Sequence, residues 1–341
     1  MDEMILKIED LCFYFHTYAG EVQAVRGVDL SLNKGESLGI VGESGCGKSV
    51  TAKSILRLNP NSNGYCKSGS IQFDGKDILT LKKNELLRIR ANDIRMIFQD
   101  PMTSLNPTMK VGKQITEGIL NAHPKMKTNE AKKIAIEALK NTGIPNPDKR
   151  YEQYPHQFSG GMRQRAMIAL ALAVNPKLLI CDEPTTALDV TLQAQILDLI
   201  KNLQKAYDTA IIFITHDLGV VANIAKNIAV MYAGKIVEYG SSRDIFYNCK
   251  HPYTWGILQS VPKPDADMSI PLVPIPGTPP DLFNPPKGCA FAARCSHALE
   301  VCRKAEPPTY NVNDKHMVSC WLYHEMAPKT INPITKQEVF L

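Results

Sequence analysis

Residues 37–49 read SLGIVGESGCGKS, an apolar run that passes into a glycine-rich loop ahead of a helix-compatible stretch. Gly42 to Ser49 match the pattern G-x-x-x-x-G-K-S/T at every fixed position. In that pattern, glycines let successive backbone N–H groups turn onto a phosphate, and the positive end of the following helix favours the anion. Lys48 would supply charge to the β and γ phosphates, and the Ser49 hydroxyl would bind Mg²⁺. The stretch predicts a nucleotide-binding loop between a strand and a helix.

Around this loop, the first 240 residues alternate short apolar runs with helical patterns, which is typical of an α/β fold. Buried parallel strands, apolar on both faces, are expected at residues 37–41, 177–181 and 210–214. Half-exposed antiparallel strands are expected at residues 4–8 and 28–32, and hairpin turns at Asp74-Gly75 and Ala233-Gly234. Apolar residues with i, i+3, i+4, i+7 spacing predict a helix, namely Ile196, Leu199, Ile200 and Leu203. The polar stretch 110–157 is expected to form a helical subdomain inserted into the α/β core.

Length and composition bound the class of protein. With 341 residues, 44% hydrophobic and 21% charged, the chain has the size of about two domains and the balance of an ordinary globular protein. Its net charge of +5 is too mild to make nucleic acid the main partner, so none is expected. No run approaches the roughly 18 apolar residues of a membrane span, and the acidic N-terminus does not resemble a secretory signal, so a cytoplasmic location is expected. In that reducing compartment, the nine cysteines are expected to be ligands, nucleophiles or core residues rather than disulfides.

A second apolar run ends in two carboxylates, in the sequence LLICDE over residues 178–183. Adjacent residues near the end of a strand point in different directions. Asp182 could therefore reach Mg²⁺ while Glu183 faces the γ-phosphate, placed to orient or deprotonate water. Acidic strand ends are common, and this pair gains its significance from the phosphate-binding loop upstream.

Residues 158–164, FSGGMRQ, resemble the signature sequence of ATP-binding-cassette (ABC) ATPases, with Phe158 and Met162 where the commonest form has Leu and Gln. A helix that starts there and ends before Asn175 would aim its positive end at a phosphate. Over residues 4–240 further motifs resemble the family in identity, order and approximate spacing: the phosphate-binding loop, Gln99 in IFQDP, Ser159-Gly160-Gly161, Asp182-Glu183, Ala187-Leu188-Asp189 and His216. The resemblance implies an ABC-type P-loop NTPase core, with a mixed sheet, an antiparallel β subdomain and an inserted helical subdomain at about residues 100–172.

The resemblance also implies roles for these residues. Gln99 would sense Mg²⁺ and water, His216 would contact the γ-phosphate, and Asp189 would belong to the loop that couples two protomers. Adenine is expected to stack on an aromatic residue near the N-terminus; Phe13, Tyr14, Phe15 and Tyr18 compete, and Phe15 is chosen by its register to the family pattern. The expected catalytic residues are Gln99, Glu183 and His216, and the expected Mg²⁺ ligands are Ser49, Gln99 and Asp182. The residues expected to contact ATP are Phe15, Gly42, Glu43, Ser44, Gly45, Cys46, Gly47, Lys48, Ser49, Val50, Ser159, Gly160, Gly161 and Asp189.

In ABC proteins two cassettes face head to tail, and each ATP lies between the phosphate-binding loop of one protomer and the signature of the other. This chain carries one set of motifs, with every catalytic position filled by the expected residue type. The resemblance therefore implies a partner cassette, either a second copy of the chain or a sister ATPase.

The last hundred residues differ in composition from the rest. Of the 23 prolines, 14 fall within residues 241–341, and nine of those within residues 260–287. Proline fixes φ and lacks the N–H, so this stretch is expected to be an extended strap rather than a helix or a central strand. The chain is therefore divided into an ABC ATPase domain (1–245), a Pro-rich strap (246–288) and a small cysteine-bearing module (289–341).

Four stretches of the tail are similar to the C-terminal extension of ATPase subunits in dipeptide and oligopeptide importers: HPYT at 251–254, PGTPPDL at 276–282, GCAFAARC at 288–295 and HMVSCW at 316–321. The sequence QDPMTSLNP at 99–107 also resembles that subfamily, at its permease-facing surface. The resemblance implies a peripheral ATPase on the cytoplasmic face of the inner membrane, which drives uptake of di- or oligopeptides through two permease subunits, with an external binding protein delivering the substrate. Nickel or oligosaccharide uptake, a non-transport ABC ATPase and a redox or iron-sensing regulator are the alternatives.

Cys289, Cys295, Cys302 and Cys320 form the densest cysteine group, with the spacing C-x₅-C-x₆-C-x₁₇-C. A small module with little apolar mass is hard to stabilise by burial alone, so a metal is physically attractive. Buried core thiols and a zinc site remain open, although structural zinc sites usually bring closely paired cysteines and none occurs here. Iron–sulfur clusters are held by four thiolates at wider spacings. The same arrangement in some peptide-importer ATPases implies a [4Fe–4S] cluster on these four cysteines.

Overall fold

The computed structural model describes residues 3–59, 63–100, 104–185, 189–261 and 274–339. The chain folds into two compact units that are built from interleaved segments. Unit 1 consists of Met1–Leu6, Leu32–Glu36 and Gln72–Phe213, and unit 2 of Lys7–Ser31, Ser37–Ile71 and Ile214–Leu341. Three expectations fall outside the described residues: positions 101–103 of the permease-facing stretch, Ala187 and Leu188 of the coupling loop, and positions 262–273 of the strap.

A mixed sheet forms the centre of unit 2, with its strands in the order β11-β12-β10-β9-β3. Its strands are β3 (Ser37–Val41), β9 (Asn227–Tyr232), β10 (Lys235–Ser241), β11 (Thr309–Asn313) and β12 (His316–Ser319). β3 lies parallel to β9, whereas β10 is antiparallel to both β9 and β12. β3 is buried along its whole length, as expected for a central parallel strand, and it leads directly to Gly42. The C-terminal hairpin β11–β12 thus extends the sheet that carries the phosphate-binding loop.

Both predicted hairpin turns are present. The chain turns at Ala233-Gly234 between β9 and β10, and at Asp74-Gly75 between β4 (Gly64–Phe73) and β5 (Lys76–Asp77). All four turn residues have positive φ angles, between 47° and 82°. Two-residue turns of this hand match the twist of the strands they connect, which is why the sequence signal was reliable.

A second sheet contains β1 (Met4–Thr17), β2 (Gly20–Asn33) and β4, in the order β2-β1-β4. Because only Tyr18 and Ala19 separate β1 from β2, the two strands run antiparallel. Each is 14 residues long, well beyond the stretches 4–8 and 28–32 that the sequence predicted. The last four residues of β1 are half-buried or exposed, so the apolar alternation fades there although the strand continues.

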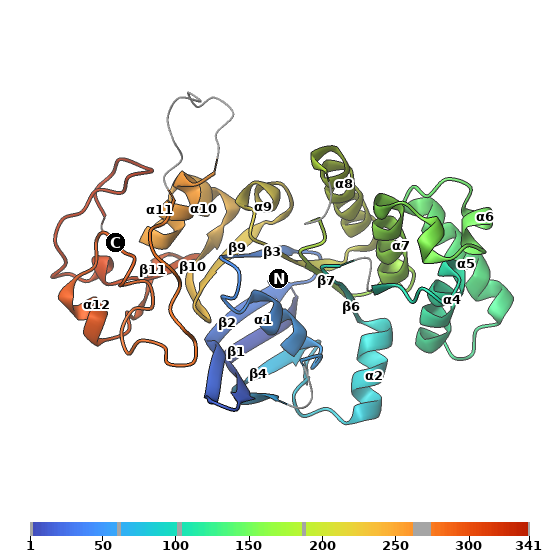
Figure 1. Cartoon of the computed structure of the whole chain (residues 1–341), viewed down its shortest axis with the longest axis horizontal. Helices are drawn as coiled ribbons and strands as arrows, with labels where there is room; N and C mark the ends of the chain where they lie inside the picture. The colour runs from blue at the N-terminus through green and yellow to red at the C-terminus, as the bar shows by residue number, and fades with distance from the viewer. Residues whose placement is uncertain (1–2, 60–62, 101–103, 186–188, 262–273, 340–341) are drawn as a thin grey trace. The chain divides into compact units, whose positions relative to one another are not determined.

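Unit 1 combines parallel strands with a group of helices (Figure 1). β6 (Ile94–Ile97) and β7 (Leu178–Asp182) pair in parallel, and β8 (Ala210–Thr215) is the neighbour of β7. The predicted strands at 177–181 and 210–214 are therefore confirmed to within one residue. The helices are α2 (Lys83–Asn92), α4 (Val111–Ala122), α5 (Thr128–Asn141), α6 (Pro147–Tyr151), α7 (Gly160–Leu172), α8 (Val190–Tyr207) and the 3₁₀ helix η1 (Pro155–Gln157).

The stretch 110–157 is helical, as its sequence predicted, and α4 and α5 each contact both α6 and α7 (green in Figure 1). Their close approach depends on Gly112 in α4, since a Cβ there would lie 2.1 Å from Cδ2 of Tyr151 in α6. The Tyr151 hydroxyl lies 2.9 Å from Oγ1 of Thr116, one turn further along α4. This contact joins α6 to α4 in addition to the packing at Gly112.

Unit 2 carries shorter helices and a core that includes the C-terminal region. The helices are α1 (Lys48–Ile55), α9 (Leu218–Ile224), α10 (Ser242–Tyr247), α11 (Pro252–Gln259), α12 (Glu300–Lys304) and the 3₁₀ helix η2 (Trp321–Tyr323). Trp255 of α11 is 2% exposed, and its indole N–H donates to the Cys249 carbonyl oxygen at 3.1 Å. Its cluster includes Val318, Cys320, Leu322 and Tyr323. Across the described ranges of both units, no helix has the length and apolar character needed to cross a membrane.

Replacing Trp255 with alanine should loosen this shared core. Truncating a buried tryptophan costs about 3–5 kcal/mol, so the free energy of unfolding measured by urea titration should fall by that amount. Tyr247→Ala is the matched control, because it truncates a ring on α10 that is 77% exposed. The control should change the free energy of unfolding by no more than about 0.5 kcal/mol. If both variants lost the same free energy of unfolding, Trp255 would make no special contribution to the stability of this core.

Candidate functional site

The phosphate-binding loop runs from Gly42, at the end of β3, into α1, and lies within unit 2. Gly47 is the N-cap residue of α1 with a φ of 103°, and a Cβ there would lie 2.4 Å from the Ala24 carbonyl oxygen. Glycine alone satisfies both constraints, which explains the glycine before the lysine. Ser44 and Gly45 are exposed, and Ser49 and Val50 at the start of α1 are half-buried, whereas Gly42 and Cys46 are buried.

Lys48 is buried, and its ammonium group is held inside the loop. Its Nζ donates to the carbonyl oxygens of Gly42 at 2.7 Å and Glu43 at 2.8 Å, and lies 3.7 Å from the Cys46 sulfur. Burial raises the pKa of the Cys46 thiol, although Lys48 opposes the shift, so the thiol is neutral at pH 7. Cys46 therefore serves as a small uncharged spacer.

Glu43 occupies a position that the loop pattern leaves variable, yet it is tied to the C-terminal region of the same unit. Its backbone N–H donates to the Tyr253 hydroxyl at 2.8 Å, and its carboxylate accepts two hydrogen bonds from the Arg294 guanidinium at 2.7 and 2.9 Å. Neither partner was predicted from the sequence. Both lie in motifs, HPYT and GCAFAARC, that the sequence analysis used only to identify the family. The one feature that could have drawn attention to Arg294 is its position among the cysteines of the second motif.

The two carboxylates at the end of β7 differ in backbone conformation and in burial. Asp182 is the last residue of the strand and is 3% exposed. Glu183 follows with a φ of 47°, a left-handed conformation that is uncommon for a residue with a side chain. Its Oε2 accepts a hydrogen bond from Gln99 Nε2 at 2.9 Å. The structure thus brings together two residues for which catalytic roles were predicted.

The signature residues form the start of α7 in unit 1. Ser159 is the N-cap, and its Oγ accepts a hydrogen bond from the Met162 N–H at 3.3 Å. A Cβ on Gly160 would meet nothing within 4 Å, whereas a Cβ on Gly161 would lie 2.5 Å from Cδ2 of Leu192 in α8. The first glycine leaves the start of the helix open, and the second allows α7 and α8 to pack closely.

Two further side chains hold the turn after β7 and the start of α8. Gln164 of α7 is buried, and its Nε2 donates to the Pro184 carbonyl oxygen at 2.6 Å, one residue beyond Glu183. Asp189 is the N-cap of α8, and its Oδ1 accepts from the Leu192 N–H at 2.9 Å. Neither contact was predicted. An aspartate ahead of a helical run is a standard N-cap signal that could have indicated the role of Asp189, whereas no local pattern identifies Pro184 as the partner of Gln164.

The remaining predicted site residues lie in unit 2. His216 is exposed and follows β8 directly, ahead of the N-cap of α9. Phe15 is half-buried, and its ring meets that of Phe13 edge-on with a centroid distance of 5.3 Å. Tyr18 is fully exposed in the turn between β1 and β2. Tyr18 is therefore the most accessible of the aromatics that compete for adenine, a property that the family register did not reveal.

The four C-terminal cysteines lie in one region of unit 2. The backbone N–H of Cys289 donates to the Cys302 carbonyl oxygen at 2.8 Å. Burial raises the pKa of Cys289, of Cys295 to about 11, and of Cys320, and other cysteines of the group add to each shift. These three thiols are therefore protonated at pH 7. Among the described residues, no group of three or more His, Cys, Asp or Glu side chains is arranged to hold a metal ion, so the geometry does not support the predicted cluster or zinc.

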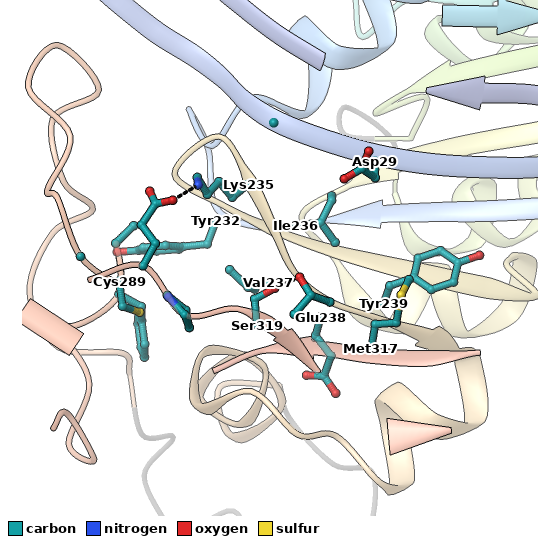
Figure 2. A pocket seen from close by; sticks show the side chains of 17 residues that line it. Asp29, Tyr232, Lys235, Ile236, Val237, Glu238, Tyr239, Cys289, Met317 and Ser319 are labelled. Atoms are coloured by element: carbon teal, nitrogen blue, oxygen red, sulfur yellow. Dashed lines mark hydrogen bonds and ion pairs between the residues drawn. The ribbon is translucent and has the colours of Figure 1, made fainter. Parts of the chain in front are cut away.

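A cavity of about 300 Å³ lies beside this region, between β10, β12 and the segment that carries Cys289 (Figure 2). Its lining includes Tyr232, Ser319 and the ion pair of Lys235 with Glu306. None of residues 42–49, all of which the structure describes, lines this cavity. It is therefore distinct from the phosphate-binding loop.

The predicted site residues are divided between the two units. Unit 2 holds the phosphate-binding loop with Lys48 and Ser49, the groups that bind nucleotide phosphates and Mg²⁺ in this class. Unit 1 holds a buried aspartate at the end of a strand, which suits a metal ligand, and the hydrogen-bonded Gln99 and Glu183, which suit a water-activating pair. Together with the α/β fold, these parts define a P-loop nucleoside triphosphatase.

Comparisons with known proteins agree with this class and narrow it. Residues 25–186 match the family described as ABC transporter, and residues 237–302 match the family described as Oligopeptide/dipeptide transporter, C-terminal region. The chain is 60% identical to the oligopeptide transport ATP-binding protein OppD of Bacillus subtilis, over 96% of this chain and 92% of that protein. It is 53% identical to the dipeptide transport ATP-binding protein DppD of Lactococcus lactis, over 96% and 93% of the two chains.

Among solved structures, the fold is similar to that of the ATP-binding cassette MJ0796, with a TM-score of 0.63 and 27% identity over 70% of this chain and 99% of that one. That structure is a dimer in a post-hydrolysis state bound to ADP and Pi. The chain belongs to the ABC transporter ATP-binding proteins, in the branch that carries the oligopeptide/dipeptide transporter C-terminal region. It is accordingly an ATPase with the α/β fold of ABC cassettes, as the sequence predicted.

Two substitutions should separate nucleotide binding from hydrolysis. Lys48→Ala should abolish ATP binding, because it removes the charge at the centre of the loop. Glu183→Gln should bind ATP with near-normal affinity but lose about 10²–10⁴-fold in turnover, because an amide cannot accept the proton of the attacking water. Titration with a fluorescent ATP analogue and assays of phosphate release measure the two effects.

The Glu183→Gln protein should also accumulate as an ATP-bound dimer on size-exclusion chromatography, since a closed dimer that cannot hydrolyse ATP does not reopen.

Lys205→Ala is the control for Lys48→Ala, because it removes a positive charge from an exposed lysine near the end of α8, and it should bind and hydrolyse ATP as wild type does. Near-normal turnover of Glu183→Gln, measured with its partner cassette present, would remove Glu183 from the mechanism.

Proposed function

We propose that this chain is the ATP-hydrolysing motor subunit of an ABC importer that takes up di- or oligopeptides. The main support is the pair of matches along the chain, an ABC region followed by a region named for oligopeptide and dipeptide transporters. Relatives at 60% and 53% identity, which the chain matches over more than nine-tenths of their length, are named for the same two cargoes.

In the proposed mechanism, residues 42–50 hold the nucleotide phosphates with Lys48 as counter-charge. Ser49, Gln99 and Asp182 would hold Mg²⁺, which would neutralise charge on the phosphates. Glu183 would accept the proton of the attacking water, and His216 would contact the γ-phosphate. The burial of Asp182 and the hydrogen bond between Gln99 and Glu183 support this division of labour. Phe15 stacks the adenine in the family register, with the exposed Tyr18 as the alternative.

The proposed partners are a second cassette, two permease subunits and, indirectly, an external binding protein. Ser159, Gly160 and Gly161 serve the nucleotide of the second cassette, with Asp189 at the contact between the two chains. The open start of α7 at Gly160 supports a role toward a nucleotide held by another chain, as does the dimeric state of the related cassette structure. The subunit is peripheral, on the cytoplasmic face of the inner membrane.

We divide the chain into the ATPase domain (1–245), the strap (246–288) and the C-terminal module (289–341). The first family match, residues 25–186, lies inside this ATPase domain, and the second, residues 237–302, spans the end of that domain, the whole strap and the start of the module. The hairpin β11–β12 ties the C-terminal module to the sheet of the ATPase domain.

We further propose that Cys289, Cys295, Cys302 and Cys320 hold a [4Fe–4S] cluster, with zinc as the alternative. The support is chemical: four thiols in one region, of the type that both metals take as thiolates, and close enough to influence one another's pKa values. A bound cluster would act as a structural staple for a module with a small apolar core.

Deleting the gene for this chain should abolish uptake of radiolabelled peptides by the cell, because the permeases lose their motor. Plasmid-borne wild type and the surface variant Lys205→Ala should restore uptake, whereas Glu183→Gln at equal abundance should not. A labelled dipeptide, a longer peptide, nickel and an oligosaccharide are tested in parallel. Unchanged peptide uptake together with loss of nickel or oligosaccharide uptake would contradict the proposed cargo.

Anaerobic purification followed by iron and sulfide analysis and an absorption spectrum tests the metal. The expected result is about four iron and four sulfide per chain and a brown colour. Replacing all four cysteines with serine should remove both, whereas Cys66→Ser, a half-buried cysteine outside the group, should keep them. One zinc without iron would establish the alternative, and iron retained by the quadruple variant would contradict both.

A further inference from the structure

Glu43 connects the lysine of the phosphate-binding loop to the C-terminal region. Its carbonyl oxygen accepts a hydrogen bond from Lys48 Nζ at 2.8 Å. Its backbone N–H is bound by the Tyr253 hydroxyl, and its carboxylate by Nη1 and Nη2 of Arg294 at 2.7 and 2.9 Å. Two parallel N–H···O contacts are the strongest geometry available to an arginine–carboxylate pair. A single residue therefore separates Arg294 from Lys48.

Arg294 is itself fixed in place. Beyond Glu43, it donates from Nε to the Pro276 carbonyl oxygen at 2.8 Å, from Nη1 to the Tyr232 hydroxyl at 3.2 Å and from Nη2 to the Ile275 carbonyl oxygen at 3.4 Å. Each of its five N–H donors therefore has an acceptor. The side chain is only 5% exposed, so water screens its pairing with Glu43 little.

Three aromatic rings support this pair. The rings of Tyr232, Tyr253 and Phe291 pack together with centroid distances between 4.6 and 5.4 Å. Cζ of Arg294 lies 5.8 and 5.9 Å from the ring centres of Tyr232 and Phe291, within the range of cation–π attraction. Burial raises the pKa of Tyr253, so its hydroxyl remains neutral and can accept the Glu43 N–H. The network thus reaches from the loop into the segment 289–295.

Breaking such a pair on one side leaves the other charge without its partner in a poorly hydrated place, and the structure around it rearranges. Without Arg294, the Glu43 carboxylate would turn toward solvent, because 29% of that side chain is already exposed. The backbone of Glu43 would then lose one of its anchors, and Lys48 one of its fixed acceptors.

We propose that Arg294 is a positioning residue of the nucleotide site, which through Glu43 holds the phosphate-binding loop in the conformation that presents Lys48 to the phosphates of ATP. The inference rests on the proposed ATPase mechanism and adds to it a dependence of ATP affinity on the C-terminal region. Because Arg294 lies between Cys289 and Cys295, the order of that segment and the affinity for ATP are linked, and by reciprocity bound ATP stabilises the segment.

Nucleotide titrations on the purified full-length chain, and steady-state kinetics on that chain together with its partner cassette, test this role. Arg294→Gln should raise the dissociation constant of a fluorescent ATP analogue and the KM for ATP by about tenfold or more, while kcat stays within about twofold. Arg294→Lys should recover part of the loss, because it keeps the charge but not the two-pronged contact. Lys304→Gln breaks an exposed ion pair with Glu300 in the same region and should leave both constants unchanged.

A merely structural role for Arg294 predicts a different pattern. Partial unfolding lowers the active fraction of the protein and therefore kcat, and leaves KM unchanged. A raised KM with little change in kcat therefore indicates the positioning role, and a lowered kcat with an unchanged KM indicates the structural role. A double-mutant cycle with Glu43→Gln tests the route. If Arg294 acts through Glu43, the double variant should bind ATP no more weakly than the weaker of the two single variants.

An unchanged KM in Arg294→Gln, or additive effects of the two substitutions, would overturn the proposal. If Arg294→Gln does not fold, then Arg294→Lys and Glu43→Gln carry the test by the same criteria. Wild type and Lys48→Ala distinguish this failure from failure of the proposed function. If wild type hydrolyses ATP, Lys48→Ala does not, and Arg294→Gln has an unchanged KM, only the role of Arg294 is wrong. If wild type neither binds nor hydrolyses ATP, the ATPase mechanism itself is wrong.

Discussion

The turn from β3 into α1 has no room for a side chain at Gly47, and much of unit 2 depends on that constraint. The Ala24 carbonyl oxygen lies where a Cβ would stand, and the positive φ excludes most other residues. Because the turn is fixed, Lys48 begins α1 with its ammonium directed back at the carbonyls of Gly42 and Glu43. Glu43 in turn forms hydrogen bonds with Tyr253 and Arg294 of the C-terminal region. The constrained turn is thus linked by hydrogen bonds, through Lys48 and Glu43, to Arg294 far along the chain.

Local pattern was enough to predict the parts of the fold that local forces determine. β3, β7 and β8 are apolar on both faces and were predicted to within one residue, and each of the two hairpin turns contains a glycine, which tolerates positive φ. The length of β1 and β2 could not be predicted in the same way. Near their shared turn, hydrogen bonds to the neighbouring strand maintain the structure where side-chain burial has already faded. Sequence patterns report burial and are blind to such pairing.

The candidate site divides along the same line. The phosphate-binding loop, the carboxylates after β7 and Gln99 were found because each belongs to a short motif whose chemistry is explicit. The pair of Glu43 and Arg294 was not, since 251 residues separate its members and no periodicity connects them. Gln164 and its contact with Pro184 escaped notice for the same reason. The cysteine spacing is the reverse case. The sequence pattern suggested a metal site, but the described residues do not show the arrangement of ligands that such a site needs.

Glu183 stands in a left-handed conformation, and its backbone is held there although such a conformation costs of order 1–3 kcal/mol for a residue with a side chain. Glu183→Gly would release that strain and remove the carboxylate at the same time. Where Glu183 is the base of the proposed mechanism, selection for heat resistance alone would therefore favour a protein without ATP turnover. Engineering of this chain for thermal stability therefore needs ATP turnover as a second criterion, because the strained backbone and the proposed catalytic carboxylate belong to the same residue.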